Sequence, residues 1–180
     1  MRLSLAIVVA FLAFACGSNS VKETVVSESQ LIDSLQYTYS ALEEDISAQE
    51  ILMYSEMQLE FAESLLKNYP ESPALNKWLF EGGKAGRTCG EYERGIKLFD
   101  AYLQGGAEEK AAESLFLTAF IYDEDLKEKE KAEGYYKQLL EKYPDHELSD
   151  DAEALLAQLY MTEQEIIEML MQKQEEVAKK

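Results

Sequence analysis

Apolar residues recur at helical spacing along most of this chain. Between residues 131 and 144 they return every three or four positions and form one stripe on a helix. The stripe consists of Tyr135, Tyr136, Leu139, Leu140 and Tyr143. Pro144 ends this helix, because proline lacks an N–H group and restrains the residue before it. Residues 57–70 repeat the arrangement and end at Pro70, so the pattern predicts amphipathic helices closed by prolines.

The helices recur with a period of 37 residues. Pro70 and Pro144 stand two periods apart, and residues 94–107 lie halfway between them, with Ala107 at the proline position. The aligned apolar positions are Phe61, Leu98 and Tyr135; Leu65, Tyr102 and Leu139; and Leu66, Leu103 and Leu140. A repeat of about 20–50 residues is typical of a solenoid, in which each unit packs only on its neighbours.

Another amphipathic stretch precedes two of these helices. Residues 75–86 precede the second helix and residues 112–124 precede the third. Gly82 and Ala119 occupy the same place in the two stretches, where small residues let neighbouring helices approach closely. The predicted turns are residues 89–92 and 125–132. The sequence therefore predicts successive helix pairs.

The N-terminal half is expected to contribute one more helix pair. Its first helix lies near residues 27–43 and carries Leu31, Leu35 and Leu42. Its second, longer helix lies near residues 46–68 and carries Ile51, Tyr54, Leu59 and Phe61.

The C-terminal residues are expected to close the stack. Ser149 can cap a helix over residues 150–160, and Thr162 with Glu165 makes a capping box that begins a last helix. The apolar residues expected to face the stack from this last helix are Ile166, Met169 and Leu170. The sequence thus predicts about eight helices in four stacked pairs.

These helix pairs resemble the tetratricopeptide repeat (TPR) family. The matching positions are Trp78 and Leu115, Gly82 and Ala119, Tyr122, Ala132, and Pro70 and Pro144. Gly95 and Ala107 depart from the family pattern, and each period has three extra residues. The match is best over residues 112–144. The resemblance implies an all-α fold, a right-handed α-solenoid of antiparallel helix pairs over residues 27–180, with an irregular helical bundle as the alternative.

In this family the first helix of each pair lines a concave groove that holds a peptide or a partner helix. Carried over by the pattern, the groove residues are Leu79, Gly83 and Arg87 in one repeat and Glu113, Phe116 and Phe120 in the next. Arg87 would meet a partner carboxylate, and the two phenylalanines would meet apolar side chains. The resemblance therefore implies protein binding.

Residues 1–15 have the features of a secretory signal peptide. Arg2 supplies a cationic start, an apolar run follows, and Ala13 and Ala15 are the small residues that signal peptidase accepts. The run is too short to span a membrane. Cys16 directly follows the cleavage position, which resembles the lipobox of bacterial lipoproteins, with Ala13 in place of the usual leucine.

The lipobox resemblance implies that Cys16 becomes a lipid-modified N-terminus, and several acyl chains on one residue give durable anchoring. Residues 16–26 then form a flexible tether. Gly17 is not the aspartate of an inner-membrane retention signal, so we expect the periplasmic face of the outer membrane, with a soluble periplasmic protein as the alternative. Residues 141–160 also resemble repeats of periplasmic lipoproteins, including BamD-like assembly components and the Tol–Pal-associated coordinator.

The net charge of the chain limits the kinds of partner that it can bind. The chain has 35 acidic against 17 basic residues, a net charge of −18, and loss of Arg2 with the signal makes it one unit more negative. Such a surface repels phosphate backbones and anionic head groups, so nucleic acid is not an expected partner. The charges are interspersed along helices, as on a solvated helical surface, and the acidity leaves room for a basic partner.

Candidate catalytic or metal-binding groups are sparse. His146 is the single histidine and lies in a polar turn, where we expect an exposed loop residue. Cys89 has no partner if Cys16 is acylated, and burial as a small hydrophobic residue is expected rather than reactivity. Residues 81–86 lack the spacing and the preceding strand of a phosphate-binding loop. The sequence predicts no catalytic residue, metal site, cofactor or small-molecule substrate.

These observations predict a lipid-anchored, non-catalytic periplasmic scaffold that binds other envelope proteins in outer-membrane assembly or envelope maintenance. The alternative is a soluble periplasmic helical-repeat enzyme or carbohydrate-related protein. The absence of a recognisable catalytic set argues against that alternative.

Overall fold

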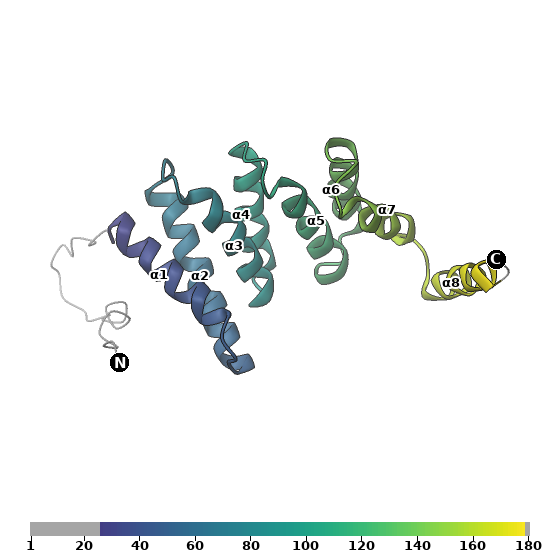
Figure 1. Cartoon of the computed structure of the whole chain (residues 1–180), viewed down its shortest axis with the longest axis horizontal. Coiled ribbons are helices and arrows are strands. Elements are labelled where there is room, and N and C mark those ends of the chain that lie inside the picture. Colours follow the sequence, from purple (N-terminus) through teal and green to yellow (C-terminus); the bar gives the residue numbers. More distant parts are fainter. Residues whose placement is uncertain (1–25, 179–180) are drawn as a thin grey trace.

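The computed structural model describes residues 26–178, in which every regular element is a helix (Figure 1). The elements are α1 (Glu28–Leu42), α2 (Ala48–Asn68), α3 (Leu75–Thr88), α4 (Tyr92–Gln104), α5 (Ala111–Phe120), the π-helical turn η2 (Ile121–Asp125), α6 (Lys129–Lys142), α7 (Ser149–Gln158) and α8 (Glu163–Ala178). The predicted helices are all present.

The helices from α1 to α7 pack in chain order, each against the next, and form an elongated row (Figure 1). The predicted period is confirmed, because α4 and α6 begin 37 residues apart. This is the architecture of an all-α, TPR-like solenoid, in which stacking on both neighbours buries the apolar stripe of each helix.

The apolar side chains form two core clusters. The first joins α1 to α4 around Leu59, Trp78 and Phe99 and extends to α5 and η2, and the second joins α5 to α7 around Leu115 and Tyr136. Three partly buried residues pack against both clusters: Leu103, Tyr122 and Tyr143. A cavity of about 390 Å³ lies at this junction of α4, α5 and α6. The core is therefore continuous but less tightly filled between the second and third helix pairs.

Glycines let α3 and α4 approach each other closely. A Cβ atom on Gly83 would lie 2.6 Å from the Phe99 ring, and one on Gly86 would lie 2.6 Å from the Cα of Gly95. A Cβ on Gly82 would meet Ala62 and Leu98 at 2.6 and 2.7 Å. The predicted role of Gly82 as a close-packing residue is confirmed. Gly95, a departure from the family pattern, is the partner that permits this contact.

Polar side chains link one pair to the next. Arg94 on α4 forms two hydrogen bonds with Glu63 on α2, at 3.0 and 2.7 Å. This fork on a carboxylate raises the pKa of Arg94 further above its ordinary value, with the hydrogen bond to Glu63 as the largest cause. The Tyr135 hydroxyl donates to Asp100 at 2.8 Å across the next junction.

One predicted cap is confirmed and one is wrong. Thr162 and Glu165 exchange the hydrogen bonds of a capping box at the start of α8. Ser149 does not cap α7, because it is the first residue of that helix and its hydroxyl instead donates to the backbone oxygen of Tyr143 at 2.6 Å. That bond holds the start of α7 against the end of α6.

The fourth helix pair differs from the prediction. Within the described part of the chain, α8 does not pack along α7 and stands apart at the C-terminal end (Figure 1). Ile166 and Met169, expected to face the stack, are only partly buried, and the side chain of Leu170 lies outside the description. The apolar pattern of this segment specifies a helix but not its partner, and Ile167 and Met171, 53% and 62% exposed, are not covered by α7.

The predicted signal peptide at residues 1–15, the lipidated Cys16 and all but the last residue of the predicted tether lie outside the described residues. Among the helices between residues 26 and 178, none is both long enough and apolar enough to cross a membrane.

Candidate functional site

Four cations lie over aromatic rings along the odd-numbered helices. The Nζ atom of Lys77 is 4.4 Å from the centroid of Trp78 and 5.0 Å from that of Tyr39. The Nζ atoms of Lys84 and Lys110 lie 5.5 and 5.9 Å from the centroid of Phe80. The Cζ atom of Arg87 is 4.7 Å from the centroid of Phe120. We call this set the cation–aromatic strip, and it comprises Tyr39, Lys77, Phe80, Lys84, Arg87, Lys110, Phe116 and Phe120.

The helical repeat of α3 produces most of this strip. Lys77, Lys84 and Arg87 recur at seven- and three-residue intervals and so share one face of the helix. On α5, Phe116 and Phe120 are one turn apart and their rings stack at 6.2 Å with an interplanar angle of 22°. The strip therefore runs from α1 across α3 to α5, along the first helices of successive pairs.

Each of three cations covers a more deeply placed acidic partner. Lys84 pairs with Glu81 at 2.9 Å, and the two side chains are 48% and 15% exposed. Arg87 pairs with Asp125 at 2.8 Å, with exposures of 37% and 19%. Lys110 pairs with Glu113 at 2.7 Å, with exposures of 43% and 20%. The positive member is outermost in every pair, so the strip presents cations to a partner.

The π-helical turn η2 positions one of these acids. It continues α5 and carries Asp125 to the Arg87 guanidinium, whose Nε donates to the carboxylate. Turns of this kind occur often at functional sites. A cavity of about 280 Å³ opens beside this pair, between α3 and α5. Its lining residues are Lys84, Arg87, Thr88, Phe99, Leu117 and Asp125.

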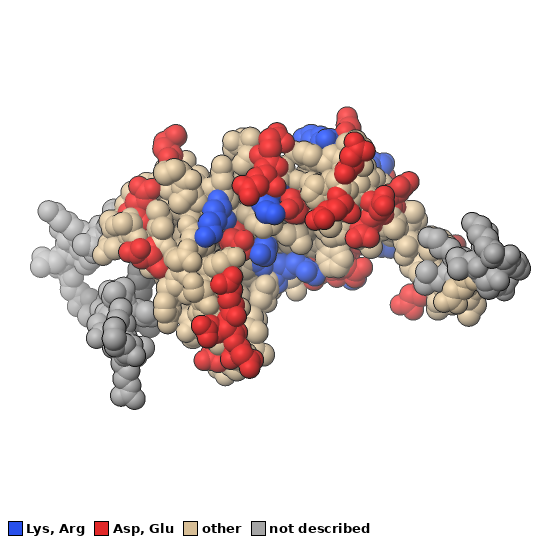
Figure 2. All heavy atoms as spheres, in the orientation of Figure 1, with Lys and Arg blue, Asp and Glu red and all other residues tan. Residues whose placement is uncertain are grey.

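Basic side chains are not spread evenly over the surface. On the face shown in Figure 2, most of the basic side chains gather over the middle of the body, and acidic side chains lie around them. Hydrogen bonding to Glu113 raises the pKa of Lys110, so this cation keeps its charge at neutral pH. A strip of cations and rings within an acidic surface favours a ligand that is both anionic and apolar.

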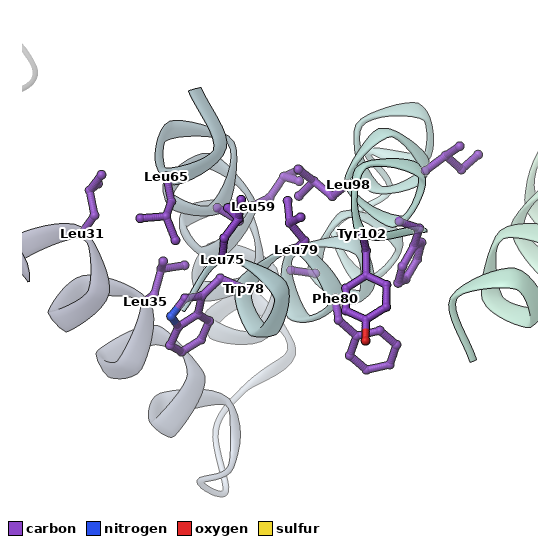
Figure 3. Packing of buried hydrophobic residues seen from close by; sticks show 14 of the residues in the cluster. Leu31, Leu35, Leu59, Leu65, Leu75, Trp78, Leu79, Phe80, Leu98 and Tyr102 are labelled. Atoms are coloured by element: carbon purple, nitrogen blue, oxygen red, sulfur yellow. The ribbon is translucent and has the colours of Figure 1, made fainter. Parts of the chain in front are cut away.

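The structure separates the six predicted groove residues into two groups. Arg87, Phe116 and Phe120 lie together on the strip, and Glu113 supports Lys110 at its edge. Leu79 and Gly83 lie in the core, where Leu79 is 2% exposed and Gly83 faces Phe99. Figure 3 shows Leu79 among the buried leucines between α2 and α4. These two residues offer no surface to a partner, so we leave them out of the candidate site.

The sequence interpretation missed Lys77, Phe80, Lys84 and Lys110. A signal for two of them was present, because Lys77, Lys84 and the predicted Arg87 follow one another on a single face of the 75–86 helix and its extension. The sequence pattern assigns the charges of Lys77 and Lys84 to a solvated helical surface. The position of Lys110, at the start of α5 beside Phe80, depends on the tertiary fold.

The two residues considered for chemistry are both partly buried. His146, expected to be exposed, has 28% of its side chain exposed, and its Nε2 lies 3.8 Å from Glu113. Its Nδ1 accepts a hydrogen bond from the backbone N–H of Leu148, which fixes the ring in the turn. Cys89, expected to be buried, is a partly buried free thiol, and burial raises its pKa. Among residues 26–178 there is no group of three acidic, histidine or cysteine side chains that could hold a metal ion.

Comparison with protein families gives one match. Residues 113–146 match the family described as tetratricopeptide repeat, which agrees with the predicted best repeat at 112–144. Neither the comparison with curated proteins nor the comparison with solved structures finds a match. The chain therefore contains a tetratricopeptide repeat within a TPR-like solenoid, a type of module that generally serves as a protein-interaction scaffold.

Proposed function

We propose that this chain is a non-catalytic scaffold of the bacterial cell envelope, anchored by lipid on Cys16 at the periplasmic face of the outer membrane. Its cation–aromatic strip binds a protein partner there. The observation that carries the proposal is the strip itself, which places exposed cations beside aromatic rings on the first helices of three successive pairs.

The strip has the composition of an energetically important interface. Arginine and large aromatic residues dominate the binding energy of protein interfaces, and they act best beside pockets. Arg87 lines the cavity between α3 and α5, and the Phe120 ring beneath its guanidinium stacks with Phe116. The outer position of the cations also speeds the encounter with an oppositely charged partner.

The anchoring part of the proposal depends on the N-terminal sequence. A cationic start, an apolar run and Ala13 and Ala15 directly before Cys16 are the features that support it. Lipid on the first processed residue would hold the strip close to the membrane, with the residues up to 26 as a tether.

Replacing the anchoring cysteine tests this part. In cells that make the Cys16→Ser variant, we expect the protein to move from the membrane fraction to the soluble fraction, because the acyl chains supply the anchoring energy. Cys89→Ser is the matched control and should remain in the membrane fraction. A Cys16→Ser protein that still sediments with membranes would show that lipid on Cys16 does not anchor the protein.

Replacing the paired rings tests the strip. Envelope proteins captured by the wild-type chain should be recovered at least about tenfold less by a Phe116→Ala/Phe120→Ala variant, since interface aromatics contribute about 2 kcal/mol or more each. Tyr37→Ala removes an equally large, exposed ring outside the strip and should leave recovery unchanged. Equal recovery by a folded double variant, checked by circular dichroism, would reject the strip as the binding surface.

A further inference from the structure

We infer that the cation–aromatic strip of one molecule accepts the C-terminal helix α8 of a second copy, so that the chain self-associates. This inference rests on the proposed role of the strip as a binding surface, and it names α8 of a second copy as one ligand of that surface. It also explains why α8 stands apart from the stack (Figure 1).

Helix α8 carries an apolar face without a partner. Ile167 and Met171 are one helical turn apart and are 53% and 62% exposed. Neither residue belongs to the two core clusters of residues 26–178. The helix also begins with Glu163 and Glu165, and Glu168 follows one residue after Ile167. An amphipathic helix that is acidic and apolar at once would gain from burial against a basic, aromatic surface.

The strip has the complementary chemistry. Its stacked rings, Phe116 and Phe120, offer an apolar platform, and sulfur–aromatic contacts favour methionine at such a place. Arg87 lies over Phe120, Lys84 lines the same cavity as Arg87, and both charges are outermost in their ion pairs. The rest of the chain is strongly acidic, so most other parts of a second copy would repel α8.

The arrangement of the helices favours a second copy over the same molecule. The strip lies on α1, α3 and α5, whereas α8 begins beyond α7 at the far end of the row (Figure 1). Only the residues between Gln158 and Glu163 connect α7 with α8, and the Thr162–Glu165 capping box fixes where α8 starts. This short connection keeps the start of α8 at the α7 end of the row, away from α3.

The contact joins two different surfaces, so it is not self-complementary. Contacts of this kind either close into a ring or a reciprocal pair, or continue from copy to copy. In each case the average mass of the particles increases with protein concentration.

Sedimentation equilibrium of the chain from residue 16, with Cys16→Ser to keep lipid off, tests the inference. We expect the average mass to rise above that of the monomer at high micromolar concentration. The Ile167→Ser/Met171→Ser variant should remain monomeric. Leu52→Ser/Met53→Ser removes a comparably exposed apolar pair from α2 and should associate as the wild type does. A wild-type chain that stays monomeric throughout, or an α8 variant that still associates, would overturn the inference.

Charge reversal identifies the two surfaces. Lys77→Glu/Lys84→Glu on the strip and Glu163→Lys/Glu168→Lys on α8 should each abolish association, and a mixture of the two variants should restore it. Association that survives both reversals, or a mixture that stays monomeric, would contradict the pairing of strip and helix. A monomeric chain whose partner capture still depends on Phe116 and Phe120 would refute this inference and leave the proposed function standing.

Discussion

Replacing Gly86 by alanine is expected to lower the free energy of unfolding by about 2 kcal/mol, although alanine favours helices by about 1 kcal/mol over glycine. The new Cβ would lie 2.6 Å from the Cα and 2.8 Å from the backbone nitrogen of Gly95. Backbone atoms cannot turn aside as a flexible side chain can, so α3 and α4 would have to separate. Urea denaturation followed by circular dichroism measures the change.

Gly134 provides the matched control for this prediction. It lies within α6, and a Cβ atom at that position would have no neighbour within 4 Å. Gly134→Ala should therefore raise stability by up to about 1 kcal/mol through helix propensity alone. If Gly86→Ala stabilised the chain as Gly134→Ala does, α3 and α4 would not be in close contact at Gly86, and the prediction would be wrong.

Replacing Trp78 by alanine is expected to lower the free energy of unfolding by about 3–5 kcal/mol, the usual cost of removing a large buried aromatic side chain. Trp78 is 2% exposed and belongs to the first core cluster (Figure 3). Its ring meets Tyr39 of α1 edge-on at 6.1 Å, so it holds the first helix to the third. Thermal unfolding monitored by circular dichroism gives the measurement.

Tyr37→Ala is the control for the tryptophan, because it removes a ring that is 61% exposed on α1. Its effect should be within about 0.5 kcal/mol, as for ordinary surface substitutions. A Trp78→Ala variant as stable as Tyr37→Ala would mean that the first core cluster does not depend on this contact between α1 and α3.

The solenoid was predictable because residues that end helices, and residues that permit close helix packing, recur along the chain. Pro70 and Pro144 end equivalent helices, and Gly82 stands where a Cβ atom would collide with the neighbouring helices. Helix ends were less predictable. Ser149 is a residue type that often caps helices, but its hydroxyl instead donates a hydrogen bond to the nearby backbone oxygen of Tyr143. Tertiary structure decided between two hydrogen bonds that the sequence allowed equally.

The candidate site was predictable only in part. Arg87, Phe116 and Phe120 followed from the repeat register, which places equivalent residues on equivalent helix faces. The same register placed Leu79 and Gly83 beside them, yet the close approach of α4 buries both. A one-residue shift of register on α3 separates a surface position from a core position. The separation of α8 from α7 was not predictable, because its residues keep the same helical apolar pattern whether or not they pack against the stack.

Site-specific photocrosslinking in cells tests the central claim most directly. A photoreactive amino acid at Lys84, on the strip, should form covalent adducts with a partner protein, whereas the same group at Lys97, exposed on α4, should form none. Adducts at position 84 that vanish in the Phe116→Ala/Phe120→Ala background are the predicted result. Adducts at position 97 with none at position 84 would contradict the account.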